Sequence, residues 1–344
     1  MPMPIDASSL AAATALFGAC TLVIGIVGTR LARIVDQLAD RTGLGEAMAG
    51  AVLLGMATSL SGIVVSVSSA WTDKPELAMS NALGGIAVQT VFLAIADIAH
   101  RRANLEHAAA SLGNMIQGGL LLSLLSLLLV GRYAPQWTLL QVHPITPLLF
   151  LAYLFGLHLV RSSRYRPMWN PAKTRETRAD EPEASSNERS LTFLWLLFLL
   201  LGASIGIAGW LLERSATVIS EETGLSQAAV GVLLTSVATS LPELVTTVAA
   251  VRQGALTLAV AGIIGGNAFD TLFAAASDVA YRGGSIYHAI PDHVALWIAL
   301  SILMTSVLLL GLLFRQEQGP GRIGFESLLI IALYLAGIVM LIAG

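Results

Sequence analysis

The sequence predicts an all-α membrane protein whose ten transmembrane helices form two inverted repeats of five helices. Three observations support this fold class: the composition, the length of the apolar runs, and a register shared by the two halves of the chain. Hydrophobic residues make up 55% of the 344 residues, and charged residues only 12%. Because soluble domains carry about a quarter charged residues, this composition argues against a soluble globular protein.

The apolar residues gather in runs that are long enough to cross a bilayer, which takes roughly 20 mostly apolar residues as a helix. Ten segments qualify: 9–29, 44–70, 77–99, 108–130, 144–160, 191–212, 225–250, 255–280, 290–313 and 324–343. Between the fifth and sixth lies segment 162–190, which is rich in Pro, Ser, Glu and Arg and has no apolar run. We interpret it as a linker between a first repeat, 1–161, and a second, 191–344.

The basic residues are distributed unequally between the two sides of the membrane. If alternate loops face opposite sides, four lie on one side: Lys74, Arg132, Arg214 and Arg282. The other fifteen, seven of them within 161–189, lie on the side of the linker. The positive-inside rule therefore makes the linker cytoplasmic and places both termini outside the cytoplasm. The compact Ala- and Leu-rich chain is typical of a prokaryotic inner-membrane protein.

An internal repeat appears when the sequence is aligned with itself so that Gly43 falls on Gly224. Segment 43–99 then falls on 224–280 without a gap, and 21 of the 57 positions are identical. The matches include Ala57–Leu60 on Ala238–Leu241, in which polar residues keep the register. Since each half has an odd number of spans, the second half enters the membrane from the opposite side. Inverted repeats are characteristic of secondary transporters, which bind their substrates near the midplane between the repeats.

Polar residues interrupt the seventh predicted span at Thr239, Ser240, Pro242 and Glu243. Pro242 lacks an N–H and is expected to kink or open the helix. Carbonyls freed at membrane depth persist only where they are satisfied or line a polar cavity. Carbonyl, hydroxyl and carboxylate oxygens together favour hard cations such as calcium and sodium.

The eighth predicted span carries Gly265, Gly266, Asn267 and Asp270. The two glycines permit local unwinding or close packing, and Asn267 and Asp270 share a helix face. Glu243 and Asp270 are the acids deepest in any span, and no span interior contains a Lys or Arg. Because a bare carboxylate at the bilayer centre costs at least ~2.5 kcal/mol, each acid must hold a proton or face a metal ion or water. The alternative is a protonated acid that only bonds a neighbouring helix.

The first repeat offers weaker candidates for the same site. Thr58 and Ser59 match Thr239 and Ser240, and Gln89 matches Asp270. The Gln89 side-chain carbonyl can coordinate a cation, but Ser and Thr also commonly join membrane helices. Asp97 and Asp278 are matched acids near helix ends. We interpret them as a cation-attracting vestibule at each mouth, or as acids that are only solvated.

The second-repeat residues carry a family resemblance. "TSLPEL" at Thr239–Leu244 and "GGNAFD" at Gly265–Asp270 resemble the two motifs of the α-repeats in the cation/calcium exchanger superfamily, which includes the sodium/calcium exchangers. The resemblance implies a sodium/calcium exchanger-like antiporter with alternating access. It also implies Glu243 as the main carboxylate ligand, completed by Thr239, Ser240, Asn267 and Asp270, and sliding of the first and sixth helices to switch access.

The first repeat departs from this pattern. Gly62 stands where the family has a second glutamate, Ser61 replaces the proline, and Ile86 replaces the asparagine. The metal would therefore face only Glu243 and Asp270, both from one repeat. Full ionisation balances one calcium ion, whereas a shared proton leaves a site for a monovalent ion. Water is one candidate to fill the space at Gly62.

These features predict a cation antiporter that exchanges calcium or sodium against sodium or protons, with inorganic cations as cargo and the lipid bilayer as surroundings. The alternative is a degenerate transporter that responds to cations or binds a partner without flux. An enzyme is not expected, because the histidines form no HExxH spacing and no serine sits in a GxSxG elbow. The sequence has no glycine-rich phosphate loop, and we expect no cofactor and no nucleic-acid partner.

Overall fold

The computed structural model describes residues 9–42, 55–100, 104–165, 167, 169–172, 190–317, 319 and 323–343. Within these ranges the protein is helical, apart from turns and one isolated bridge between Leu139 and Val142. The all-α prediction is therefore confirmed. The beginning of the predicted span 44–70 and most of the predicted linker 162–190 lie outside the described residues.

The helices of the first half are α1 (Leu10–Thr42), α3 (Leu60–Trp71), α4 (Pro75–His100), α5 (Leu105–Ala109), α6 (Leu112–Tyr133) and α7 (Ile145–Tyr165). Those of the second half are α8 (Leu191–Thr223), α9 (Gln227–Ala229), the π-helix η1 (Val230–Thr235), α10 (Ser236–Thr239), α11 (Leu241–Gln253), α12 (Leu256–Ala280), α13 (Ile286–Ala289), α14 (Asp292–Phe314) and α15 (Phe325–Ala343). Among the described residues, eight helices are long and apolar enough to span a membrane. A ninth span is the bent pair Gln227–Thr239 and Leu241–Gln253.

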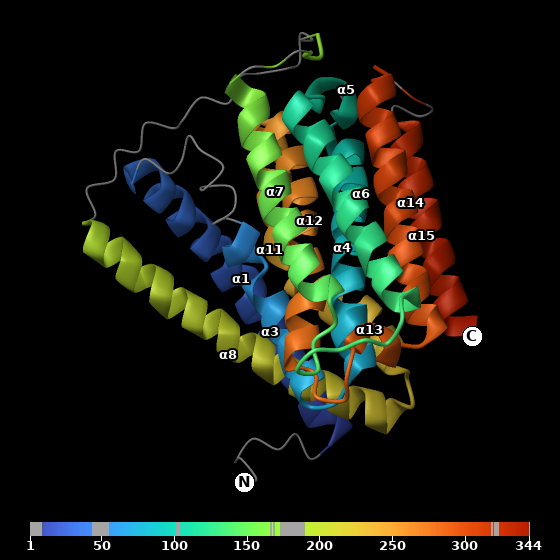
Figure 1. Ribbon diagram of the computed structural model, residues 1–344. Coiled ribbons are helices and arrows are strands. Elements are labelled where there is room, and N and C mark those ends of the chain that lie inside the picture. The colour runs from blue at the N-terminus through green and yellow to red at the C-terminus, as the bar shows by residue number, and fades with distance from the viewer. Residues whose placement is uncertain are drawn as a thin grey trace.

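The helices form two layers (Figure 1). Helices α1 and α8 pack against each other along their lengths and lie tilted beside an upright bundle that contains α4, α6, α7, α12, α14 and α15. The tilted pair contacts the bundle mainly through α3, α10, α11 and η1. At the centre of the bundle, α4 and α12 are the most deeply buried of the long helices.

The duplication recurs in the helix boundaries. In the register that places Gly43 on Gly224, helices α1 and α8 begin and end at equivalent positions, and α4 and α12 begin at equivalent positions. Short helices α5 and α13 also begin at equivalent positions, yet they lie at opposite ends of the molecule (Figure 1). The two repeats are thus inverted, as the odd number of predicted spans required.

Both repeats contain a helix break at the same serine. In the second repeat the chain bends by 48° between α10 and α11, around Ser240. In the first repeat the turn falls at Ser59, whose φ of −81° and ψ of 1° match the −94° and 6° of Ser240. The first-repeat break forms without a proline, and Pro242 occupies the first turn of α11, where a missing N–H costs little. The break near Pro242 is confirmed, but the proline is not its sole cause.

The predicted break at Gly265 and Gly266 is wrong, because both glycines lie inside the continuous helix α12. Both glycines face amide side chains at ordinary contact distance. A Cβ on Gly266 would lie 3.6 Å from Oε1 of Gln89, and one on Gly265 would lie 3.6 Å from Nε2 of Gln117. Helix α12 therefore presents an unbroken backbone that neighbouring amide side chains can approach.

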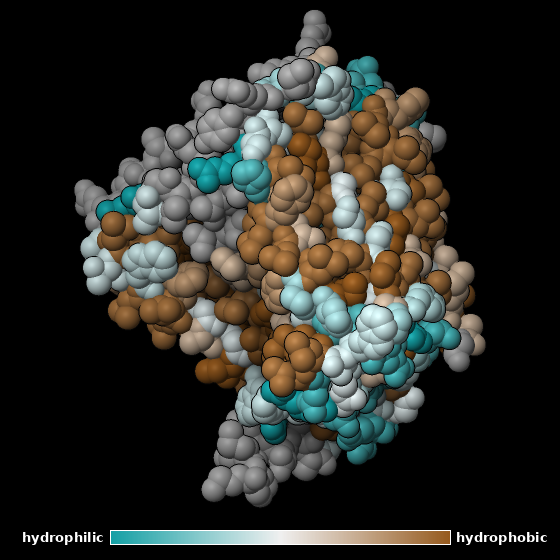
Figure 2. All heavy atoms as spheres, in the orientation of Figure 1, coloured by the Kyte–Doolittle hydropathy of each residue, from teal (hydrophilic) through white to brown (hydrophobic). Residues whose placement is uncertain are grey.

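The surface agrees with a membrane environment. Apolar side chains cover the middle of the bundle in a broad band, and polar side chains gather towards its two ends (Figure 2). Large hydrophobic residues such as Leu154, Phe155, Leu196 and Leu310 are more than half exposed on long helices. Such residues are stable at a surface only when the surrounding solvent is itself apolar. The chain is a multi-pass membrane protein.

Small residues allow α4 to pack closely against the π-helix, and this contact is testable at two adjacent glycines. A Cβ on Gly84 would lie 2.8 Å from the backbone Cα of Val232, whereas the nearest atom to a Cβ on Gly85 is 3.7 Å away. We expect Gly84→Ala to lower the free energy of unfolding by ~1–2 kcal/mol, because overpacking outweighs the gain in helix propensity. Thermal unfolding in detergent measures this. Gly85→Ala is the matched control, and equal destabilisation by both variants would contradict the packing described.

Candidate cation-binding site

Glu243 and Asp270, the two acids deepest in the predicted spans, come together at the centre of the protein. The side chain of Glu243 leaves the first turn of α11, and that of Asp270 leaves the middle of α12. Their exposed fractions are 5% and 1%. The Ser59 hydroxyl, at the first-repeat helix break, is 2.6 Å from Oδ1 of Asp270 and 3.4 Å from Oε1 of Glu243. One hydroxyl from the first repeat therefore bridges two carboxyls from the second.

Gln89 reaches the same site from α4. Its amide Nε2 donates to Oδ2 of Asp270 at 2.7 Å and to the Ser240 hydroxyl at 3.2 Å. Gln89 and Asp270 occupy matching positions in the two repeats, as do Ser59 and Ser240. The centre is thus assembled from symmetry-related positions that carry different chemistry: acids in one repeat, and neutral donors in the other.

The remaining predicted residues lie at the edge of this group. The Thr58 side chain hydrogen-bonds to Glu243, and its hydroxyl lies 3.2 Å from the carbonyl of Gly55. The Thr239 hydroxyl instead bonds the Ser236 carbonyl of its own helix. Asn267 lies one turn before Asp270, and its amide donates to Thr90 at 3.1 Å. The structure therefore joins Glu243, Asp270, Ser59, Gln89 and Ser240 in one network, with Thr58 attached to it.

Several buried oxygens of the site find no hydrogen-bond partner within the described part of the chain. They are Oε2 of Glu243, Oε1 of Gln89 and Oδ1 of Asn267. None of the ion pairs formed among the described residues involves Glu243 or Asp270, and no third His, Cys, Asp or Glu of the described ranges completes a metal-binding group. Unpaired buried acceptors are costly, and a proton, a water molecule or a small cation can satisfy them.

Phe273, which the sequence did not single out, fills the space beside Gly62. A Cβ added to Gly62 would lie 2.7 Å from Cε2 of the Phe273 ring. Phe273 is itself buried in α12, one turn beyond Asp270. The expectation that water fills the gap left at Gly62 is therefore wrong, because an aromatic ring occupies it. In the sequence, Phe273 is visible only as an apolar residue at helical spacing from Asp270.

Asp97 and Asp278 lie near helix ends, but they do not form open mouths. Their exposed fractions are 1% and 0%. Asp97 accepts hydrogen bonds from the backbone N–H of Leu105 and Gly324 and from the Ser327 hydroxyl. Asp278 accepts from the backbone N–H of His143 and Ile286 and from the Thr146 hydroxyl. In this conformation both aspartates tie α5 and α13 to the bundle, and the predicted vestibule is not formed by them.

A further buried acid, Glu106 of α5, lies near Asp97 and Glu326. Neither carboxyl oxygen of Glu106 has a hydrogen-bond partner within the described part of the chain. Burial, followed by the charges of Asp97 and Glu326, raises the pKa of Glu106 well above its ordinary value. This acid lies at the α5 end of the molecule, near the hydrogen bonds by which Asp97 joins α5 to the start of α15.

The fold and this acidic centre define a helical membrane protein of the inverted-repeat class. The chain belongs to the sodium/calcium exchanger family. The family model, described as "Sodium/calcium exchanger protein", matches residues 12–163 and 192–343, which together form most of the chain. The two matched segments correspond to the two repeats, so the family resemblance read from the α-repeat motifs is confirmed.

Individual relatives agree with this assignment. The chain is 28% identical over 312 residues to the inner membrane protein YrbG of Escherichia coli, covering 90% of this chain and 91% of that protein. Its fold is similar to the H+/Ca2+ exchanger CAX, with a TM-score of 0.73 at 12% identity, covering 96% of this chain and 82% of the other. It is also similar to the sodium–calcium exchanger NCX_Mj, with a TM-score of 0.62 at 16% identity and coverage of 95% and 97%.

The bridging hydroxyl of Ser59 can be tested against its symmetry mate. Ser59→Ala removes the hydroxyl that contacts both acids, whereas Ser240→Ala removes only an acceptor of Gln89. We expect Ser59→Ala to lower the free energy of unfolding by ~1–3 kcal/mol, because a buried carboxyl loses a hydrogen bond, and we expect a smaller effect from Ser240→Ala. Thermal unfolding measures both variants. An equal or larger cost for Ser240→Ala would contradict the bridge.

Proposed function

We propose that the protein is a secondary active cation antiporter with a single central site formed around Glu243 and Asp270. The observation that carries the proposal is the pair of buried carboxyls, joined by Ser59 and without a basic partner in any ion pair of the described residues. Such a pair is stable in an apolar bundle only when it holds a proton or a cation. Binding one of these and releasing the other is the elementary act of exchange.

The donor set supports competition between protons and one metal cation. When both carboxyls are ionised, their charge balances one calcium ion, and a single shared proton leaves a net charge that suits sodium. Oxygens of Gln89, Asn267 and the serines add neutral ligands, as hard cations require. The Phe273 ring beside Gly62 removes one side of the possible coordination shell. We therefore infer exchange of calcium or sodium against protons or sodium, with protonation of the acid pair as the competing state.

The two-layer architecture supports alternating access. The tilted pair α1 and α8 contacts the bundle at the two helix breaks: Gly28 packs on Pro242, and the matched Gly209 packs on the backbone of Ser61. Small residues at these contacts allow one layer to shift along the other without deep interlocking. Because both contacts lie within a few residues of Ser59 or Glu243, a shift of the layer changes which side of the membrane reaches the site.

The distribution of Lys and Arg residues supports one orientation in the membrane. We propose that the protein lies in an inner membrane with the linker end, where the basic residues gather, in the cytoplasm and with both termini outside it. The chain ends of α1 and α15 lie at the same end of the molecule, opposite α5 (Figure 1). Reporter fusions placed after Gly344 and within 173–189 test this arrangement, and a cytoplasmic C-terminus would overturn it.

Flux in proteoliposomes tests the proposed function. The purified protein is reconstituted with calcium, sodium and pH indicators, and an imposed gradient of one ion is expected to drive counter-movement of another. Glu243→Gln and Asp270→Asn are expected to lower the rate at least ~10-fold, because each removes a charge that the bound cation requires. Asp292→Asn is the matched control, since the Asp292 side chain is 86% exposed.

The outcomes separate exchange from binding alone. Absence of flux for every ion pair, or unchanged flux in Glu243→Gln, would overturn the antiporter. If calcium or sodium raises the melting temperature without any flux, the protein is instead a cation-responsive membrane protein that has lost transport. The acid variants would then lose the thermal stabilisation, and Asp292→Asn would retain it.

A further inference from the structure

Phe273 and Gly62 form a matched pair next to the candidate site. Gly62 is the symmetry mate of Glu243 and lies one turn after Ser59. Phe273 lies one turn after Asp270 on α12. Ser59 and Asp270 are hydrogen-bonded at 2.6 Å. Gly62 and Phe273 each lie one turn further along the same two helices, so Gly62 lies against the Phe273 ring. The place where symmetry calls for a third carboxylate is therefore occupied by an aromatic edge.

The ring is held in this position by its neighbours. Phe273 is 3% exposed, and its ring packs edge-on against Phe269 at 6.1 Å, which in turn packs against Tyr153 at 6.1 Å. A ring in such a row moves less freely than an isolated one, because its neighbour packs against it. A side chain longer than glycine at position 62 would therefore have to displace the Phe273 ring.

We propose that Phe273 is a specificity-determining residue, which limits the site to two carboxylates by occupying the space that a glutamate at position 62 would need. The inference rests on the proposed function and specifies its cation preference. With two acids and one wall of hydrocarbon, the site favours a proton or an ion of low coordination number over tightly bound calcium. Calcium takes six to eight oxygens, and its affinity rises with the number of charged ligands.

The test replaces the glycine by an acid and the phenylalanine by a small residue, first separately and then together. Gly62→Glu alone places a carboxylate against the ring, Phe273→Ala alone opens an empty space, and the double variant fits the carboxylate into that space. Calcium affinity is measured on purified protein, by thermal stabilisation and by calorimetry, without any transport step. We expect the double variant to bind calcium ~10-fold or more tightly than the wild type, and neither single variant to do so.

Each outcome decides the proposal. A gain in Gly62→Glu alone that equals the gain in the double variant would show that the ring is no barrier. A folded double variant without any gain would show that the space does not belong to the site. If the double variant does not fold, Gly62→Asp with Phe273→Ala provides a shorter acid for the same comparison. The proposed function is tested separately by flux in the wild type, so the two failures are distinguishable.

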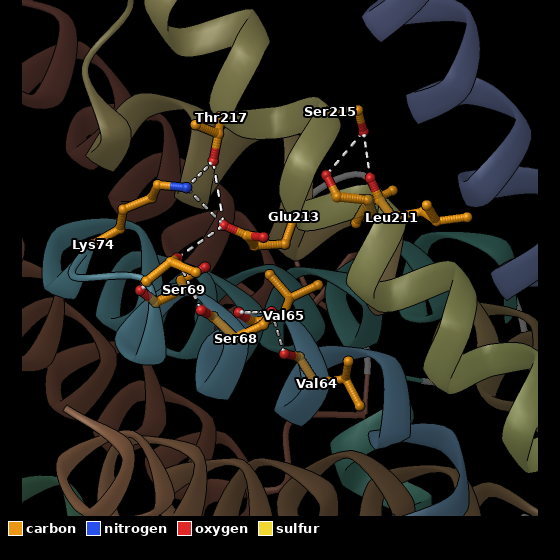
Figure 3. A network of polar contacts seen from close by, with 11 residues as sticks. Val64, Val65, Ser68, Ser69, Lys74, Leu211, Glu213, Ser215 and Thr217 are labelled. Carbon is orange, nitrogen blue, oxygen red and sulfur yellow. Dashed lines mark hydrogen bonds and ion pairs between the residues drawn. The ribbon is translucent and has the colours of Figure 1, made fainter. Parts of the chain in front are cut away.

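A second inference comes from an ion pair that crosses between the two layers. Nζ of Lys74, in the turn between α3 and α4, lies 3.1 Å from Oε1 of Glu213 on α8 and 2.8 Å from the Thr217 hydroxyl (Figure 3). Thr72 and Thr217 also donate to the same carboxylate oxygen. The Glu213 side chain is 2% exposed, so the pair is largely withdrawn from solvent on the acid side.

The two positions of this ion pair carry no charge in the other repeat. In the register of the repeat, the mate of Lys74 is Ala255 and the mate of Glu213 is Ala32. Both alanines lie in the matched turn and helix of the opposite repeat, so these two positions cannot form an ion pair there. In an inverted-repeat protein, the two access states exchange the environments of the two repeats. An ion pair between Lys74 and Glu213 therefore stabilises one state, and the matched positions Ala255 and Ala32 cannot stabilise the other in the same way.

We infer that the pair formed by Lys74 and Glu213 is a one-sided latch, which holds α8 to the bundle and biases the protein towards the access state described by this structure. Breaking the pair by a shift of α8 would leave a buried carboxylate without its cation, which is strongly unfavourable. The latch rests on the proposed alternation between two states, and it is tested by conformation rather than by flux.

Hydrogen–deuterium exchange of the protein in lipid nanodiscs provides that test. We expect Glu213→Gln and Lys74→Met to increase exchange severalfold in residues 213–223 and, reciprocally, to decrease it in the matched residues 32–42. The reversed pair, Lys74→Glu with Glu213→Lys, is expected to restore the wild-type pattern. Arg132→Gln is the control, because it breaks an ion pair at 2.9 Å between α6 and α14, which both belong to the bundle.

The reciprocal change distinguishes a latch from local support. An increase confined to residues 213–223, with no change at the opposite end, would show that the pair only stabilises its own turn and would overturn the inference. So would the same reciprocal change in Arg132→Gln. If one single variant does not fold, the other carries the comparison, since each breaks the same ion pair. None of these measurements requires transport, so the latch and the proposed function are tested independently of each other.

Discussion

Two carboxyls buried in an apolar bundle, outside every ion pair of the described residues, are the constraint on which the rest of this structure depends. Glu243 and Asp270 share the Ser59 hydroxyl, and Gln89 supplies the second donor to Asp270. These neutral donors orient the acids but cannot neutralise them. In the function that we propose, a proton or a cation supplies the positive charge, and its arrival and departure couple the site to the solutions on either side of the membrane.

The helix breaks bring these groups to one place. Ser59 and Ser240 have nearly the same backbone angles although only one repeat has a proline, so the break belongs to the duplicated architecture. Each break ends one helix and begins another at the centre of the bundle, and each leaves a serine there. Continuous α4 and α12 cross the breaks and contribute Gln89 and Asp270. The site is therefore a product of symmetry in the backbone.

The same symmetry makes the differences between the repeats informative. Acids stand in the second repeat where the first has Gly62 and Gln89, and Phe273 fills the space that the smaller residue leaves. At one end of the tilted layer an ion pair joins α8 to the bundle, and at the other end the matched positions are alanines. A backbone with near-twofold symmetry thus carries an asymmetric charge distribution, and in the mechanism that we propose this asymmetry makes the two access states unequal in energy.

The sequence by itself determined the fold class, the duplication and the acids. Long apolar runs, a gapless register between the two halves and two acids in spans without a basic residue are local or periodic signals, and each follows from the cost of polar groups in hydrocarbon. Only the tertiary structure decided what surrounds those acids. The filling of the Gly62 space by Phe273, the burial of Asp97 and Asp278, and the continuity of α12 through Gly265 and Gly266 depend on contacts between segments far apart in the chain. Such contacts leave no periodic trace in a single sequence, because an apolar residue looks the same whether it faces lipid, a helix or the space of a missing acid.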